Sequence, residues 1–166
     1  MNKRLIVFLF FIVSISIKSE AQIKTAQFYY EYVVGRITQA IGNDTLLAHA
    51  LLDMDHRRAD SARQVILSQI NNSHKAIKDL EPFRDNQTFK NATADLLFFY
   101  KTVFEKDYAR LVVILSHATY GVLPDNELRE FDDILNSIDR REQIVKSEFD
   151  KERMIFIEKY QVKIKD

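Results

Sequence analysis

Four long segments of this sequence carry apolar residues at spacings of three, four or seven, which places those side chains on one face of an α-helix. The clearest stripe runs from Phe89 to Ala118, and the other three lie within residues 25–53, 56–80 and 124–162. Short connections between long amphipathic helices favour antiparallel neighbours. We therefore predict an all-α fold, an antiparallel four-helix bundle with up-down-up-down topology.

The breaks between the segments carry few but specific signals. Pro82 ends the second segment, because proline lacks the N–H that a helix interior needs. Asn86 is placed to cap the third helix, Gly121 ends it, and Pro124 suits the first position of the fourth helix. The chain has no cysteine, so we expect the stability of the bundle to come from packing.

Residues 1–21 predict a secretory signal peptide. Lys3 and Arg4 give it a positive start, and the apolar run from Leu5 to Ile17 is shorter than the roughly 20 residues that span a bilayer. Ser19, Glu20 and Ala21 fit the small-x-small cleavage pattern.

We therefore expect a mature chain that begins near Gln22 and forms a single bundle domain over residues 22–166, located in the periplasm or at the cell surface. The alternative is an uncleaved membrane anchor. No later segment is apolar enough to predict a membrane span.

Three short motifs are spread along the mature chain, over residues 29–35, over residues 98–101 with 104–108, and over residues 149–152 with Phe156 and 158–160. Together they resemble a group of exported bacterial surface proteins with no assigned activity. The resemblance covers essentially the whole mature chain and implies an exported four-helix fold. It implies no activity and carries over no functional residue.

Gly35 and Gly42 lie seven residues apart and so share one face of the first predicted helix. Each costs about 1 kcal/mol relative to alanine in a helix interior, which a close helix approach, a kink or room for a ligand would offset. Tyr32 and Gln39 lie beside them, and Glu142 falls in the apolar register of the fourth helix at roughly their level. A buried carboxylate needs a partner such as Tyr, Gln or Arg. These five residues are candidates for a ligand site, with close packing as the alternative.

Three histidines and an aspartate are the candidates for metal ligands. His49, Asp53 and His56 follow each other at spacings of four and three, and His117 lies at the same end of the predicted bundle. Such ligands suit zinc or another transition metal. Asp53 and His56 lie where the helix should break, so we expect solvated side chains, no metal and no cofactor.

Function is constrained mainly by what the sequence omits. The formal net charge is zero, which argues against a nucleic-acid partner, and there is no Gly-x-Ser-x-Gly, Gly-rich phosphate loop, His-Glu-x-x-His or Glu-x-x-His motif. We predict a non-enzymatic interaction or structural protein of the periplasm or cell surface, with an envelope protein or a small ligand as partner. The alternative is a carrier that binds a small apolar or amphipathic ligand between the helices, which the inward-facing aromatic residues would favour.

Overall fold

The structure, a computed structural model, describes residues 25–42, 45–118 and 121–164. Over these residues the fold is all-α, with four long helical segments and no β-strand, which confirms the predicted fold class. The elements are α2 (Ala26–Ile41), α3 (Thr45–Leu52), α4 (His56–Asp79), α5 (Thr88–Thr102), the π-helical turn η2 (Val103–Asp107), α6 (Tyr108–Leu115) and α7 (Asp125–Tyr160).

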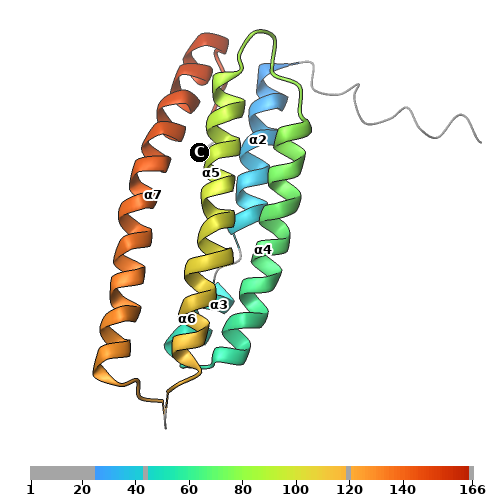
Figure 1. Cartoon of the computed structure of the whole chain (residues 1–166). Helices are drawn as coiled ribbons and strands as arrows, with labels where there is room; N and C mark the ends of the chain where they lie inside the picture. Colours follow the sequence, from blue (N-terminus) through green and yellow to red (C-terminus); the bar gives the residue numbers. More distant parts are fainter. Residues whose placement is uncertain (1–24, 43–44, 119–120, 165–166) are drawn as a thin grey trace, which may run out of the picture.

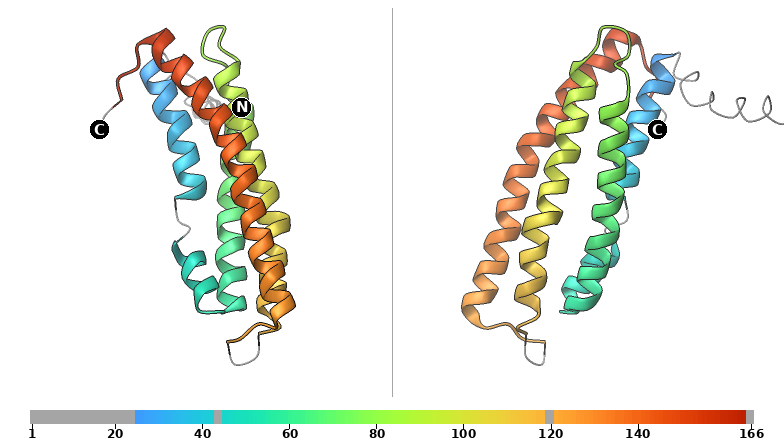
Figure 2. Two further views of the ribbon diagram at one scale, coloured as in Figure 1. Left: turned by 90° about the vertical axis from the view of Figure 1, so that its left-hand side faces the viewer. Right: turned by 45° about the vertical axis from the view of Figure 1, so that its right-hand side comes forward.

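The four segments lie side by side along their length (Figure 1). The chain descends through α2 and α3, returns along α4, descends again through α5, η2 and α6, and returns along α7. α4 packs against α2, α3, α5 and α6, whereas α7 packs along α5 and meets α6 and η2. Figure 2 shows α7 crossing the other helices obliquely, so that its C-terminal end comes close to the start of α2.

Side-chain caps fix the start of three helices. Thr25 Oγ1 accepts a hydrogen bond from the N–H of Phe28 (3.3 Å), and Asp55 Oδ1 accepts one from Arg58 (3.0 Å). Asn86 Oδ1 accepts from the N–H of Phe89 (3.2 Å), as predicted for a capping residue. These oxygens satisfy N–H groups that have no partner inside the first helical turn.

The predicted continuous helix over residues 25–53 is wrong, because α2 ends at Ile41 and α3 starts at Thr45. The N–H of Gly42 bonds to the carbonyl of Thr38 (2.8 Å), and a side chain at Gly42 would overlap that carbonyl oxygen. Gly42 therefore marks the end of α2. It does not carry the free-energy cost of a glycine in a helix interior, because it lies outside the helix.

The third predicted helix is continuous from α5 to α6, but it contains the π-helical turn η2, which the sequence did not predict. Buried Arg63 of α4 donates from Nη1 to the carbonyl of Phe104 in this turn (3.0 Å) and from Nε to Asp60 (2.8 Å). The wide turn is thus tied to the neighbouring helix by an arginine that the apolar stripes do not include.

The fourth helix begins at Asp125, with Pro124 just before it rather than as its first residue, and ends at Tyr160. None of the helices in the described ranges is long and apolar enough to cross a membrane. The predicted signal peptide, residues 1–21, and the expected start at Gln22 lie outside the described residues.

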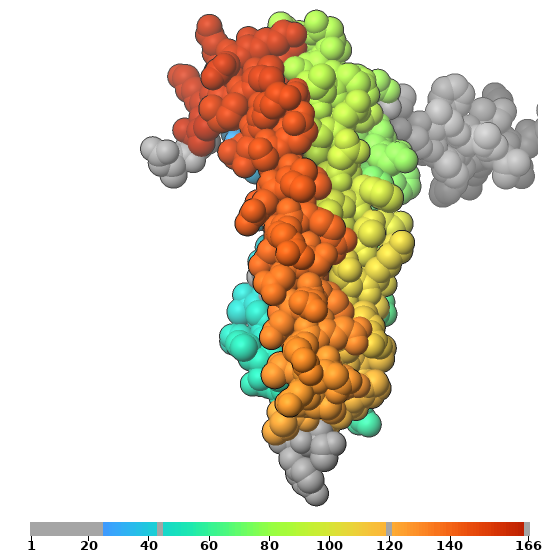
Figure 3. Space-filling view, turned by 60° about the vertical axis from the view of Figure 1, so that its left-hand side comes forward, coloured from blue at the N-terminus to red at the C-terminus, as the bar shows by residue number. Residues whose placement is uncertain are grey.

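Aromatic rings fill the end of the molecule where α2 begins and α7 ends. Tyr29 of α2 stacks on Phe156 of α7 with ring centroids 5.5 Å apart, and both side chains are fully buried. At the other end, α7 lies over the molecule with α3 along one side and α6 along the other (Figure 3). The rings of the aromatic cluster come from α2, α5, α7 and the connection between α4 and α5: Tyr29, Tyr30, Phe83, Phe89, Phe149, Phe156 and Tyr160.

Candidate functional site

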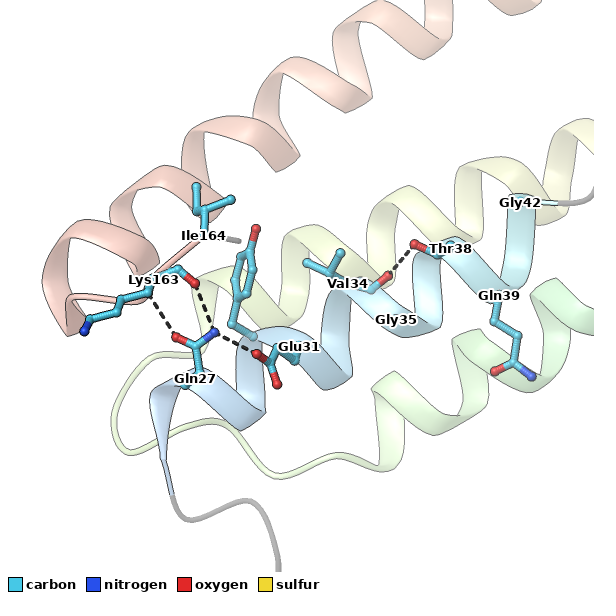
Figure 4. A pocket seen from close by; sticks show the side chains of 10 residues that line it. Gln27, Glu31, Val34, Gly35, Thr38, Gln39, Gly42, Lys163 and Ile164 are labelled. Atoms are coloured by element: carbon cyan, nitrogen blue, oxygen red, sulfur yellow. Dashed lines mark hydrogen bonds between the residues drawn. The ribbon is translucent and has the colours of Figure 1, made fainter. Parts of the chain in front are cut away.

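An open groove of about 820 Å³ runs along the outer face of α2. One wall is the face of α2 that extends from Gln27 to Gly42, and Lys163 and Ile164 form the opposite side at one end (Figure 4). We call this feature the α2 groove. The groove is open at the surface, and Tyr30, a buried residue of the core, is among the residues that line it.

Gly35 lies in the middle of the α2 groove. A Cβ built at this position would meet no atom within 4 Å, so no neighbouring helix approaches Gly35 closely. Of the three explanations considered for the glycines, room beside the helix fits Gly35. Gly42 needs none of them, because it lies just after the end of α2. The absent side chain of Gly35 leaves the groove open next to Val34.

Gln27 closes the end of the α2 groove with a paired hydrogen bond. Its Nε2 donates to the carbonyl of Lys163 (3.0 Å), and its Oε1 accepts from the N–H of Lys163 (2.9 Å). Nε2 also donates to Glu31 Oε1 (2.8 Å), which orients the amide. Figure 4 shows this network between α2 and the segment that follows α7.

The structure brings together three of the five predicted ligand-site residues, since Gly35, Gln39 and Gly42 line the α2 groove. Gln39 is directed away from Ile164 (Figure 4) and accepts a hydrogen bond from Arg36 Nη1 (3.1 Å). Tyr32 does not line the groove, because its ring packs under the guanidinium of Arg36, 4.8 Å from the centroid.

Glu142 is half-buried and faces Tyr100 of α5 rather than the α2 groove. Its Oε1 accepts a hydrogen bond from the hydroxyl of Tyr100 (2.6 Å) and lies 3.4 Å from Lys146 Nζ. Burial, together with the hydrogen bond to this carboxylate, raises the pKa of Tyr100 far above its usual value, so the hydroxyl stays a donor. Tyr100 is therefore the partner that an inward carboxylate requires.

The histidines and acidic residues considered for metal binding have other contacts. Asp53 pairs with Arg58 (3.1 Å), and His117 Nδ1 lies 2.8 Å from Glu127 Oε1. His49 is exposed near the end of α3. Over residues 25–42, 45–118 and 121–164 the structure forms no group of three or more side chains that could hold a metal ion.

The sequence did not predict the other seven residues that line the groove, and Gln27 and Lys163 are the most informative of them. They are 136 positions apart, and Gln27 contacts the backbone of Lys163. A backbone contact does not depend on residue type, so the sequence carries no signal for it. The groove as a whole offers amide, carboxylate and hydroxyl groups beside the apolar Val34 and Ile164. This set suits hydrogen bonding and apolar contact with a bound chain or molecule.

Comparisons with known proteins give no match for this chain. The resemblance of residues 29–35 and of the two later motifs to exported bacterial surface proteins stays a prediction, because nothing in these comparisons supports it. No protein-family model matches this chain, and neither a curated protein nor a solved structure gives a significant match.

Proposed function

We propose that this chain is an exported, non-enzymatic interaction protein of the bacterial periplasm or cell surface. Its mature part, residues 22–166, would be an antiparallel up-down-up-down four-helix bundle that presents the α2 groove to a partner. The signal-peptide pattern of residues 1–21 supports export, and the groove supports the interaction role.

The observation that carries the proposal is the open space beside Gly35. A glycine inside an exposed helix is unfavourable by about 1 kcal/mol relative to alanine. No helix packs against Gly35, so close packing does not explain it. A partner that uses the space left by the missing side chain would explain why the groove is kept open.

The test is photo-crosslinking in the native host. A benzophenone amino acid replaces Thr38, which lines the groove, and in a matched control it replaces Ser68, which is exposed on α4. The proposal predicts a reproducible adduct from position 38 only. Equal adducts from both positions, or none from position 38, would contradict it.

Export is tested separately by mass spectrometry of the purified native protein. Cleavage after Ala21 and recovery from the envelope or periplasmic fraction are the expected results. A full-length chain that fractionates with the cytoplasm would rule out this part of the proposal while leaving the groove untouched.

A second candidate function is a carrier for a small apolar or amphipathic ligand. The apolar side chains of Val34 and Ile164, which line the groove from opposite sides, favour it. Native mass spectrometry should then show a retained ligand in the wild type that is lost in Gly35→Leu, with Ser68→Leu as the control. A wild-type protein that carries no ligand would leave only the interaction role.

A further inference from the structure

The segment that follows α7 is non-helical and forms one side of the α2 groove at its Gln27 end (Figure 4). Gln161 has left-handed backbone angles (φ 54°, ψ 44°), which end the helix and turn the chain. The N–H of Val162 bonds back to the carbonyl of Ile157 (3.1 Å), and the side chain of Val162 is buried. Lys163 and Ile164 then run along one end of the groove.

Gln27 recognises this segment through its main chain. A glutamine side chain carries one carbonyl acceptor and two N–H donors. The acceptor and one donor pair with the N–H and carbonyl of Lys163, and the other donor goes to Glu31. Both backbone groups of Lys163 are thus satisfied as they would be beside a neighbouring β-strand, while its side chain takes no part.

Branched apolar side chains flank the recognised residue. Val162 is buried against the bundle, and Ile164 lines the groove although it is still 54% exposed. Recognition of an extended chain by main-chain hydrogen bonds, with alternate side chains in apolar sites, is a common way to bind peptides. Gln27, at one end of the α2 groove, already holds the main chain of the protein's own C-terminal segment in this way.

The groove continues beyond that segment. From Glu31 to Gly42 the face of α2 is about 16 Å long, at roughly 1.5 Å per residue. About five further residues of extended chain would cover that length, at roughly 3.3 Å each. Within the described residues, Lys163 and Ile164 line only the end beside Gln27.

We propose that the α2 groove binds an extended peptide segment of a partner protein, with branched apolar residues at alternate positions, and that Val162–Ile164 holds the same site until the partner displaces it. This inference rests on the proposed interaction function and names the class of partner. A tethered segment competes at an effective concentration in the millimolar range, so the partner binds more tightly once the segment is released.

The test uses the full mature chain and a fluorescein-labelled peptide with the sequence of residues 160–166, Tyr-Gln-Val-Lys-Ile-Lys-Asp. Lys163→Pro removes the N–H that Gln27 accepts and so weakens the hold on the protein's own segment. By fluorescence anisotropy, Lys163→Pro should bind the peptide at least about tenfold more tightly than the wild type. Adding Gln27→Ala should reverse the gain, and adding Gln143→Ala, an exposed glutamine on α7, should not.

A second measurement does not depend on the proline variant. In the wild type, hydrogen exchange at the Lys163 amide should become faster when the unlabelled peptide saturates the groove, because its hydrogen bond to Gln27 is lost. Unchanged exchange, equal peptide affinity of the wild type and Lys163→Pro, or an affinity insensitive to Gln27→Ala would each overturn the inference.

The two proposals fail in different ways. Adducts from position 38 without any peptide binding would overturn the extended peptide as the partner class and leave the interaction role. Peptide binding controlled by Gln27, with no adduct from position 38, would support the peptide site and overturn the interaction role in the native host.

Discussion

At the scale of single residues, the hydrogen bond between Tyr100 and Glu142 is the clearest polar contact between α5 and α7. The oxygen atoms are 2.6 Å apart, and the Tyr100 side chain is buried. A hydrogen bond to a charged acceptor contributes more than one between neutral groups. This pair therefore fixes how α7 lies on α5.

We predict that Tyr100→Phe lowers the free energy of unfolding by about 1–2 kcal/mol, because Glu142 then keeps only its contact with Lys146. Tyr32→Phe is the matched control, since the Tyr32 ring packs under Arg36, and should change stability by less than about 0.5 kcal/mol. Urea unfolding followed by circular dichroism measures both. Equal effects of the two variants would show that the hydroxyl of Tyr100 is not important.

Arg63 gives a second prediction at this scale. Replacing it with methionine keeps much of the side-chain volume but leaves the Phe104 carbonyl without its donor. An unsatisfied buried carbonyl costs about 1–3 kcal/mol, so Arg63→Met should destabilise by that amount. Arg58→Met, at an exposed arginine of the same helix, should cost far less. A loss no greater than that of Arg58→Met would argue that η2 does not need the arginine.

At the scale of the helices, the two glycines of the first segment have opposite roles. An alanine at Gly35 adds a methyl group that meets nothing, whereas one at Gly42 overlaps the Thr38 carbonyl. Gly35→Ala should therefore raise the free energy of unfolding by about 0.5–1 kcal/mol, and Gly42→Ala should lower it. Thermal unfolding of the two variants checks the sign. A destabilising Gly35→Ala would mean that the space beside α2 is already filled.

The stripes of apolar residues predicted α4 and α7 well, because periodicity and Pro82 or Pro124 are local signals. The break after Ile41 and the turn η2 were missed because apolar spacing runs through both without a change. Glu142 is half-buried against Tyr100, in keeping with its place in the apolar register. It faces α5 rather than the α2 groove, because the choice of neighbouring helices depends on packing that no single helix encodes.

At the scale of the whole molecule, the aromatic cluster predicts sensitivity to alkali. Burial raises the pKa of Tyr29 to about 12. The unfolded chain loses this proton near pH 10. A rise in pH from about 10 to about 12 therefore stabilises the unfolded chain relative to the folded chain. The contribution of Tyr29 to the free energy of unfolding is therefore fully present below about pH 10 and is lost above it.

Tyr29→Phe should remove up to about 2 kcal/mol of that alkaline loss, measured as the difference in urea stability between pH 8 and pH 12. The comparison between the two pH values cancels the effect of the substitution at neutral pH. Tyr100, whose pKa is also raised, contributes a loss of the same sign in both proteins. An unchanged pH dependence in Tyr29→Phe would assign the whole effect to other groups.

The aromatic cluster also equips the protein with an internal optical probe. The chain has no tryptophan, so its seven tyrosines supply the intrinsic fluorescence. Tyr29, Tyr30 and Tyr160 all belong to the cluster, where α2 meets α7. Any movement that parts these two helices would alter their emission, so opening of this end is observable without attaching a dye.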